Sequence, residues 1–305
     1  MNILVIGGSY FAGRVFVLMA AKKEEFSLTL LNRGRYSLNL DRVREARCDR
    51  HDQEKLEELL NNTSWDAVVD FCAYEPVDVS GILNIPGFAA KHYLLFSTSS
   101  VCDVPGVSVK TELSDMISAP DGTRDGDYAY KKAVLEAELK RECEVHGTAF
   151  TIFRPSFIFG PYNYADREAW FIRQIAEGKK LPFPFEADAR FQMVYVGDIA
   201  CAVIRCLENR NSYNRIYYLA GPEVLDYPKF FDVLQKLNGR PLELDRVSNR
   251  DIVSERIPLP YPIIKDDLCD GSAITKELEF RYQLFEECMQ KTWNAFMKVY
   301  GLNPK

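Results

Sequence analysis

The sequence has few of the features that mark metal-binding, secreted or membrane proteins. It contains three histidines, far apart in the chain and without metal-ligand spacing, so no metal site is expected. Its eight cysteines include no Cys-x-x-Cys pair and are scattered along the chain, which is typical of reduced, buried thiols rather than of a disulfide framework. No stretch approaches the roughly 18 consecutive apolar residues of a membrane span, so no membrane partner is expected.

An excess of positive charge is also lacking. The 305 residues include 38 Lys and Arg against 44 Asp and Glu, which gives a net charge of −6, and no basic block stands out. A nucleic-acid partner is not expected, because binding to phosphates needs clustered cations. Only four apolar residues, Ile3 to Ile6, precede the first glycine, whereas a signal peptide needs about 7–15. We therefore predict a cytoplasmic location, and the 47% hydrophobic residues are ordinary for a globular protein.

The first half of the chain alternates short apolar runs with helix-like segments. The apolar runs lie at residues 3–6, 28–31, 67–71, 93–96 and 150–153, and a polar connection follows the second. Helices are predicted at residues 13–23, 76–84 and 128–145, the last ended by Gly147. Apolar strands without strict alternation, separated by helices, indicate a parallel sheet covered on both faces. The pattern predicts a doubly wound α/β fold of the Rossmann type, which binds ligands beyond the carboxyl ends of its strands.

The pattern changes after Gly160-Pro161. Prolines interrupt residues 181–185, a helix is predicted at 196–207 and a strand at 216–219, a loop at 256–262, and a closing helix at 284–300. We predict that residues 1–161 plus about 193–221 form a dinucleotide-binding domain. A smaller, interleaved C-terminal part, about 162–192 plus 222–305, is expected to bind the substrate.

A glycine-rich turn joins the first strand to the first helix. Gly7, Gly8 and Gly13 lie within seven residues of one another, directly after the apolar run. Such glycines let the backbone approach a pyrophosphate, and the helix start offers free N–H groups and a positive dipole. The alternative is a tight turn that only needs a positive φ at Gly7 or Gly8.

The end of the second strand bears on the choice of cofactor. The sequence there is Leu31-Asn32-Arg33-Gly34-Arg35. NAD-binding sites usually have an acidic residue at this place, whereas an arginine can accommodate the 2′-phosphate of NADP. We predict NADP(H) as the cofactor, with NAD(H) as the alternative, and we expect Arg33 to contact the phosphate unless it is simply a solvated loop residue.

A Tyr-x-x-x-Lys pair lies on the predicted helix 128–145. On a helix this spacing makes Tyr128 and Lys132 neighbours. A phenol has a pKa near ~10, and a close ammonium favours its anion, so the pair is a candidate general acid and base. A second pair, Tyr261 and Lys265, encloses a proline and falls in a predicted loop. The spacing alone is also compatible with a solvated helix face.

These pieces together resemble the extended short-chain dehydrogenase/reductase family, and more narrowly its NAD(P)-dependent epimerase/dehydratase group. The resemblance covers nearly the whole chain and is strongest up to Pro161. It rests on the glycine turn, the Tyr-x-x-x-Lys pair and five further motifs: Cys48-Asp49-Arg50, Phe71-Cys72-Ala73-Tyr74, Phe96-Ser97-Thr98-Ser99-Ser100-Val101, Arg154-Pro155-Ser156-Phe157-Ile158-Phe159-Gly160-Pro161 and Val196-Gly197-Asp198.

The resemblance implies roles for individual residues. It makes Tyr128 the proton-transfer residue, Lys132 the partner that lowers its pKa and holds the nicotinamide ribose, and Thr98 the hydroxyl that binds the reacting oxygen. Asp49 matches the position that meets the adenine, and the backbone at Ala73 passes the cofactor's ribose. The implied cofactor-binding residues are Gly7, Ser9, Tyr10, Phe11, Gly13, Asn32, Arg33, Asp49, Arg50, Ala73 and Lys132.

The chain also departs from the group's pattern. Tyr10 replaces the middle glycine and Cys102 replaces a tyrosine, so the loop looks more like an atypical branch, the relatives of chloroplast stem-loop-binding proteins. The arginine that grips a nucleotide-sugar diphosphate is not at its usual spacing, although Arg190 lies nearby in the sequence. A substrate pocket is expected from Tyr74, Phe157, Tyr162, Phe185, Arg190 and Gln192.

Three functions are compatible with this sequence. The one we favour is an NAD(P)-dependent oxidoreductase, epimerase or dehydratase that acts on a sugar, a nucleotide sugar or another carbonyl or hydroxyl compound. The alternatives on the same fold are a non-catalytic NAD(P)-sensing regulator and an RNA-binding protein. The retained Thr98, Tyr128 and Lys132 favour the enzyme. A homodimer is one assembly that the sequence allows.

Overall fold

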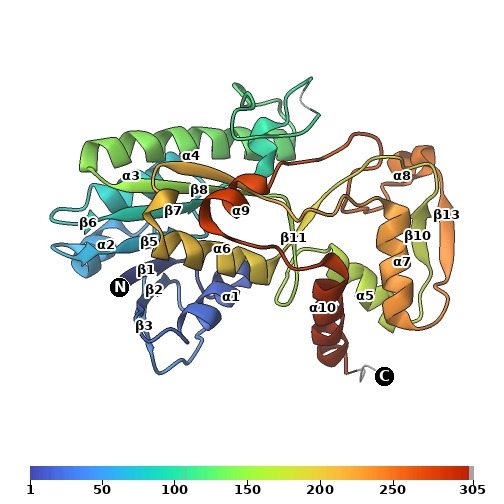
Figure 1. Cartoon of the computed structure of the whole chain (residues 1–305), viewed down its shortest axis with the longest axis horizontal. Coiled ribbons are helices and arrows are strands. Elements are labelled where there is room, and N and C mark those ends of the chain that lie inside the picture. The colour runs from blue at the N-terminus through green and yellow to red at the C-terminus, as the bar shows by residue number, and fades with distance from the viewer. Residues whose placement is uncertain (107, 302–305) are drawn as a thin grey trace.

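The larger part of the molecule is built on a parallel sheet, seen edge-on in Figure 1. The computed structural model describes residues 1–106 and 108–301. All neighbouring strands of the seven-stranded sheet run parallel. Their order across the sheet is β12 (Arg215–Leu219), β8 (Ala149–Pro155), β7 (His92–Phe96), β5 (Ala67–Asp70), β1 (Asn2–Ile6), β2 (Ser27–Asn32) and β3 (Val43–Arg47).

The strand order reverses direction beside β1. The chain builds the sheet from β1 through β2 to β3, then returns to place β5 on the other side of β1 and continues outward from there. Loops that leave β1 and β5 therefore diverge, and a crevice opens between them at the carboxyl ends of the strands. This confirms the doubly wound fold and places the glycine turn at the crevice.

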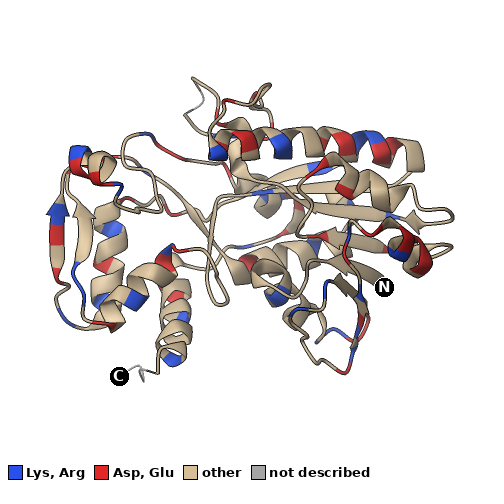
Figure 2. Ribbon diagram, turned by 180° about the vertical axis from the view of Figure 1, so that it is seen from behind, with Lys and Arg blue, Asp and Glu red and all other residues tan. Residues whose placement is uncertain are grey.

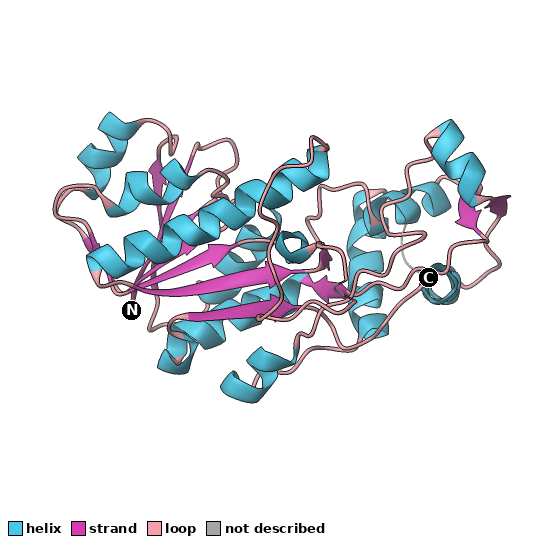
Figure 3. Cartoon of the chain, turned by 90° about the horizontal axis from the view of Figure 1, so that it is seen from above, coloured by secondary structure: helices cyan, strands magenta, loops and turns pink. Residues whose placement is uncertain are grey.

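Helices cover both faces of the sheet. Apolar residues of the strands alternate between two cores, one against α1 (Phe11–Ala20), α6 (Val196–Glu208) and α9 (Ser272–Leu278), the other against α2 (Gln53–Leu60), α3 (Pro76–Leu83) and α4 (Arg124–His146). The long helix α4 begins at Thr123, whose side chain accepts a hydrogen bond from the N–H of Gly126, and it ends at Gly147 with a φ of 64°. Figure 3 shows α4 running along the strands.

A smaller part lies beyond the carboxyl ends of the strands. It holds α5 (Glu168–Ala176), α7 (Tyr227–Asn238), α8 (Asn249–Glu255) and α10 (Phe285–Val299), around an aromatic core of its own. Its strands form the pairs β9 (Phe157–Phe159) with β11 (Met193–Tyr195), and β10 (Leu181–Pro184) with β13 (Leu244–Val247). The remaining short elements are β4 (Ser64–Trp65), β6 (Ala89–Ala90) and the 3₁₀ turns η1 (Ser99–Cys102) and η2 (Arg210–Ser212).

Some elements differ from the sequence predictions. The polar connection after β2 contains the strand β3 and the helix α2, which bury so few side chains that their apolar pattern is weak. The proline-interrupted segment forms the strand β10, because the N–H groups of Leu181 and Phe185 point to the partner strand while Pro182 and Pro184 need no partner.

The proposed division into domains remains a prediction. The helix α9 comes from the segment assigned to the substrate-binding part, yet its Ile274 and Leu278 pack into the core beneath the sheet. Positive and negative side chains are mixed over both parts of the molecule (Figure 2). Among the described helices, none has the length and apolar character needed to cross a membrane.

Candidate active site

A cleft of about 1050 Å³ runs along the carboxyl ends of the central strands, from the glycine turn to the smaller part. All of the predicted catalytic and cofactor-binding residues line it except Ala73. The structure therefore brings together residues that are up to 125 positions apart in the sequence, from Gly7 to Lys132. The catalytic and cofactor-binding roles assigned to these residues stay predictions.

The glycine turn is shaped so that only glycine fits two of its positions. Gly7 has a φ of 80°, and a Cβ there would lie 2.7 Å from Sγ of Cys72. A Cβ on Gly13 would lie 2.5 Å from the carbonyl oxygen of Gly7, so the helix packs directly on the turn. Tyr10 precedes α1 without a side-chain cap, and Phe11 has a φ of 34°. The first N–H groups of α1 are thus left to a ligand, and they suit a pyrophosphate.

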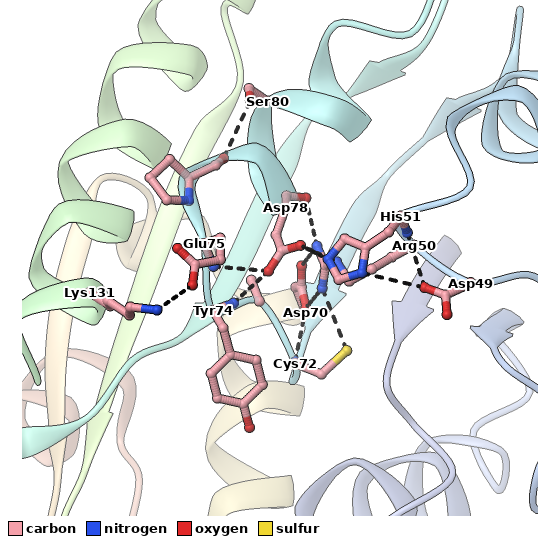
Figure 4. A network of polar contacts seen from close by, with 12 residues as sticks. Asp49, Arg50, His51, Asp70, Cys72, Tyr74, Glu75, Asp78, Ser80 and Lys131 are labelled. Atoms are coloured by element: carbon pink, nitrogen blue, oxygen red, sulfur yellow. Dashed lines mark hydrogen bonds and ion pairs between the residues drawn. The ribbon is translucent and has the colours of Figure 1, made fainter. Parts of the chain in front are cut away.

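A buried ion network, drawn in Figure 4, lies at the carboxyl end of β5, and its Arg50 lines the cleft. The guanidinium of Arg50 donates to both carboxylate oxygens of Asp70, at 3.0 and 2.9 Å, and its Nε lies 3.0 Å from a carboxylate oxygen of Asp78. Burial would raise the pKa of Asp70, but the charge and hydrogen bonds of Arg50 outweigh it and lower that pKa. Arg50 lines the cleft as predicted, yet its charge is committed to these two carboxylates.

The end of β2 borders the part of the cleft that would take the adenosine. Asn32 accepts a hydrogen bond from the N–H of Gly34 at 2.6 Å, while its buried Nδ2 has no partner among the described residues. The side chains of Arg33 and Asp49 line the cleft and are exposed. An unpartnered amide and an exposed arginine, with no acidic side chain at the strand end, fit a phosphorylated ribose.

Three tyrosines from distant segments stack beside the glycine turn. The ring of Tyr10 lies 5.5 Å from that of Tyr36, which follows β2, and 5.0 Å from that of Tyr164, which follows β9. Tyr164 also meets the ring of Phe11 edge-on at 5.9 Å. All of these residues line the cleft, so the tyrosine stack connects the two parts of the molecule across the predicted pyrophosphate site.

Lys132 occupies a buried position at the centre of the cleft. Its side chain is 3% exposed, and Nζ donates to the carbonyl oxygens of Ala73 at 2.6 Å and Phe96 at 2.9 Å. Burial lowers the pKa of this ammonium to about 8. Ala73 lies behind the wall of the cleft, with its carbonyl turned to Lys132 and its side chain fully buried, and the passage of its backbone beside the cofactor's ribose stays a prediction.

Tyr128 lies one helical turn before Lys132 and is 39% exposed. Its pKa is raised to about 12, chiefly by burial and then by Tyr74 and Tyr164, while the charge of Arg167 opposes the rise. Lys132 was expected to lower this pKa, and its ammonium lies 6.0 Å from the ring centre of Tyr128, but burial of the phenol outweighs that charge. The phenol of Tyr128 is therefore protonated at neutral pH.

Hydroxyl groups line the opposite wall. Thr98 accepts a hydrogen bond from the N–H of Ser100 at 3.3 Å, which fixes its side chain at the start of η1. The hydroxyls of Ser97 and Ser156 are buried and have no partner among the described residues. Unpartnered buried hydroxyls are rare unless a ligand or water meets them, so this wall can bind a substrate's oxygen atoms.

Only two of the six residues predicted for the substrate pocket lie at the cleft. Tyr74 and Phe157 line the cleft. The other four lie outside it and make contacts elsewhere. The ring of Tyr162 packs beneath the guanidinium of Arg14, and that of Phe185 beneath the guanidinium of Arg246. Arg190 donates to both carboxylate oxygens of Asp266, while Gln192 donates to the carbonyl of Gly221 and accepts from the N–H of Cys269.

Other residues of the cleft were missed from the sequence. Tyr164 and Arg167 reach it from the turn after β9, and their only local signal is their place just after Gly160-Pro161. Asp103 and Asp267 line it from segments far apart, both bound by the buried ammonium of Lys110 at 2.5 and 2.6 Å. Nothing in the local sequence points to this trio.

A comparison with known families now identifies the chain. A model of the NAD dependent epimerase/dehydratase family matches residues 3–220. The chain belongs to this family. The family is named for NAD-dependent epimerases and dehydratases, and the resemblance found in the sequence motifs is thereby confirmed.

Individual relatives are distant. A chloroplast stem-loop binding protein of 41 kDa from Arabidopsis thaliana is 25% identical over 255 residues, which cover 79% of this chain and 64% of that protein. The match thus spans less than two thirds of the relative's length.

Solved structures show the same fold over the full chain. UDP-glucose 4-epimerase from Thermotoga maritima, solved with UDP-glucose, superposes with a TM-score of 0.80 at 18% identity, covering 98% of this chain and 100% of that one. UDP-glucuronic acid 4-epimerase from Bacillus cereus, solved with NAD, gives a TM-score of 0.80 at 16% identity, covering 99% and 98%. At these identities the likeness concerns the fold alone.

Proposed function

We propose that the protein is an NADP(H)-dependent oxidoreductase, epimerase or dehydratase whose substrate is a sugar, a nucleotide sugar or another carbonyl or hydroxyl compound. The observation that carries the proposal is the meeting of Thr98, Tyr128 and Lys132 in the same cleft as the glycine turn. The names of the neighbouring structures, UDP-glucose 4-epimerase and UDP-glucuronic acid 4-epimerase, support a sugar-type substrate.

The cofactor would lie across the glycine turn. The free N–H groups at the start of α1 would hold its pyrophosphate, and Asn32 with Arg33 would hold the phosphorylated ribose. Lys132 would bind the nicotinamide ribose while keeping at least one of its two carbonyl partners. When bound, the cofactor supplies or accepts the hydride.

Tyr128 would transfer the proton that accompanies the hydride. Because its phenol is protonated at neutral pH, Tyr128 is a proton donor in the state described, which is the form that reduces a carbonyl. The phenol proton passes to the carbonyl oxygen as the hydride reaches the carbonyl carbon, and the phenolate left behind recovers a proton from solvent. The hydroxyl of Thr98 would hold the same oxygen in place.

The test is a comparison of two neighbouring tyrosines. Turnover is first sought with a panel of carbonyl compounds, sugars and nucleotide sugars. NADPH oxidation reports a reductase, and product formation followed by NMR reports an epimerase or dehydratase, in which the cofactor is regenerated in each cycle. Tyr128→Phe should then lower kcat by roughly 10²–10⁴, because it removes the proton donor and leaves the ring. Tyr130→Phe is the matched control, since this half-buried tyrosine lies on the same helix and outside the cleft.

Two outcomes would contradict the proposal. One is a Tyr128→Phe variant that keeps the wild-type kcat, or a Tyr130→Phe variant that loses as much of its kcat as Tyr128→Phe does. The other is NADPH binding without turnover on any compound of the panel, which would favour the non-catalytic sensor.

RNA binding is a second candidate function. The name of the Arabidopsis relative suggests it, and one observation supports it: the exposed side chains of Arg33 and Arg35 line the cleft together with the tyrosine stack. Stacked aromatic rings beside arginines suit unpaired bases. Gel-shift titrations of a stem-loop RNA over a range of salt concentrations test it, and the absence of binding at low salt would exclude it.

A further inference from the structure

Arg167 differs from the other cations at the centre of the cleft. Arg50 is paired with two carboxylates, and Lys132 donates to two carbonyl oxygens. The half-buried guanidinium of Arg167 forms no ion pair with a carboxylate of the described residues. Its hydrogen bond is a long one, 3.5 Å from Nη1 to the carbonyl oxygen of Ile158, and its flat face lies 5.5 Å from the ring centre of Phe157.

The position of this guanidinium is defined by its neighbours. Phe157 lines the cleft on one side of it, and Tyr128 is near enough for the charge of Arg167 to lower the pKa of its phenol. Because Arg167, Phe157 and Tyr128 line the same cleft, anything bound to the guanidinium would share that cleft with the phenol that we propose as the proton donor. The buried, unpartnered hydroxyl of Ser156 lines the same part of the cleft.

The chemistry of arginine indicates what would bind. Removing a guanidinium from water is costly unless a counter-charge meets it. The neighbouring carboxyl of Glu168 feels the charge of Arg167, but its oxygens accept hydrogen bonds from Gly160 and Asn163, and no carboxylate of the described residues forms an ion pair with Arg167. Its planar set of N–H groups matches the two oxygens of a carboxylate or phosphate, and stacking on an aromatic ring fixes its orientation. Arg190, the sequence candidate for such a contact, is bound to Asp266 outside the cleft.

We propose that Arg167 binds an oxyanion, a carboxylate or a phosphate, that the substrate carries close to its reacting carbon. The substrate is then an acidic carbonyl or hydroxyl compound, such as a sugar acid or a sugar phosphate. This inference rests on the proposed function, because it needs Tyr128 to mark the reacting centre. It makes Arg167 a specificity-determining residue.

The test compares charged and neutral ligands of the NADPH-loaded protein by calorimetry. The probes are D-glucose against D-glucuronate, D-glucose against D-glucose 6-phosphate, and propane-1,2-diol against D-lactate. In at least one pair the charged member should bind about 10- to 100-fold more tightly, as expected for a charge-assisted contact. The carboxylate and phosphate pairs distinguish the two sources of the oxyanion.

Three variants assign the preference to this side chain. Arg167→Ala should bring the charged and neutral members to within about twofold of each other, and Arg167→Lys should keep part of the preference because it keeps the charge. Arg173→Ala is the matched control: this half-buried arginine lies on α5, which Arg167 directly precedes, and outside the cleft, so the preference should not change.

Either of two results would overturn the inference. One is a wild-type protein that binds NADPH but prefers no charged member of the panel. The other is an Arg167→Ala protein that binds NADPH normally and keeps the wild-type preference. The NADPH dissociation constant, measured on the same samples, separates these results from a failure of the proposed function, which would appear as a loss of NADPH binding in the wild type.

Discussion

The two ends of the cleft are formed by different kinds of chain segment. The cofactor end consists of the turn after β1, the start of α1 and the ends of β2 and β5, whose positions the parallel sheet sets. The substrate end consists of side chains from segments far apart in the chain, among them Ser156, Arg167, Asp103 and Asp267. The tyrosine stack and Lys132 lie where the two ends meet.

The difference indicates that the fold determines where a cofactor can bind, whereas individual side chains determine which substrate can bind. A glycine turn at the point where the strand order reverses offers N–H groups to any dinucleotide, whatever the substrate. The chemistry of the substrate end depends on a few uncommitted groups, such as the guanidinium of Arg167 and the hydroxyls of Ser97 and Ser156. Substitutions at the cofactor end should therefore change the affinity for the cofactor, whereas substitutions at the substrate end should change substrate binding or turnover.

The largest effect on the cofactor end is expected at Gly7. Gly7→Ala places a Cβ 2.7 Å from Sγ of Cys72 at a φ of 80°, so the turn must move. The NADPH dissociation constant, measured by calorimetry, should rise on the order of 100-fold or more, because several N–H contacts depend on the turn.

Gly147→Ala is the control for backbone strain alone. Gly147 has a φ of 64° and open space around it, so its substitution should lower the melting temperature while leaving NADPH affinity unchanged. If folded Gly7→Ala bound NADPH like the wild type, the pyrophosphate site would lie elsewhere.

A smaller effect concerns the choice between NADPH and NADH. Arg33 should favour NADPH by about 10- to 150-fold, the value of a charge-assisted contact of roughly 1.5–3 kcal/mol. Paired titrations of both cofactors measure the preference, which Arg33→Ala should reduce and which Arg44→Ala, an exposed arginine on β3, should leave intact. Equal dissociation constants in the wild type would show that Arg33 does not contact the cofactor.

The smallest effect is expected where the two ends meet. Tyr164→Ala removes the ring that links the smaller part to Tyr10 and Phe11. An aromatic contact of about 0.5–1.5 kcal/mol predicts a rise of about 2- to 12-fold in the NADPH dissociation rate, measured by stopped-flow fluorescence. Tyr162→Ala, on the same turn but beneath Arg14 and outside the cleft, should leave the rate unchanged, and an equal effect of both variants would contradict a role for the stack.

The sequence predicted the cofactor end better than the substrate end for a physical reason. Strand, glycine turn and helix are neighbours in the chain, so Gly7 and Gly13 carry a local signal, and the i, i+4 spacing of Tyr128 and Lys132 does the same. The substrate end depends on contacts between distant segments, so the sequence could not show that Asp266 would bind Arg190 while Arg167 would remain uncommitted.

The same reasoning explains the error about the pKa of Tyr128. The helix spacing correctly makes Lys132 its neighbour, with Nζ 6.0 Å from the centre of the Tyr128 ring, but the spacing does not show how far the phenol is buried. Here the ammonium is directed to the carbonyl oxygens of Ala73 and Phe96, which belong to segments that only the sheet brings together. Burial of the phenol then dominates its pKa.

We expect the cleft to work as one site, in which Lys132 acts at both the cofactor end and the substrate end. The most direct measurement is the NADPH dissociation constant of Tyr128→Phe, Lys132→Ala and the control Lys131→Ala, whose exposed ammonium binds Glu75 instead. We expect Lys132→Ala to raise the constant by about 10-fold or more and the other two to stay within about twofold of the wild type. Wild-type affinity in folded Lys132→Ala, or an equal loss in Tyr128→Phe, would contradict the claim.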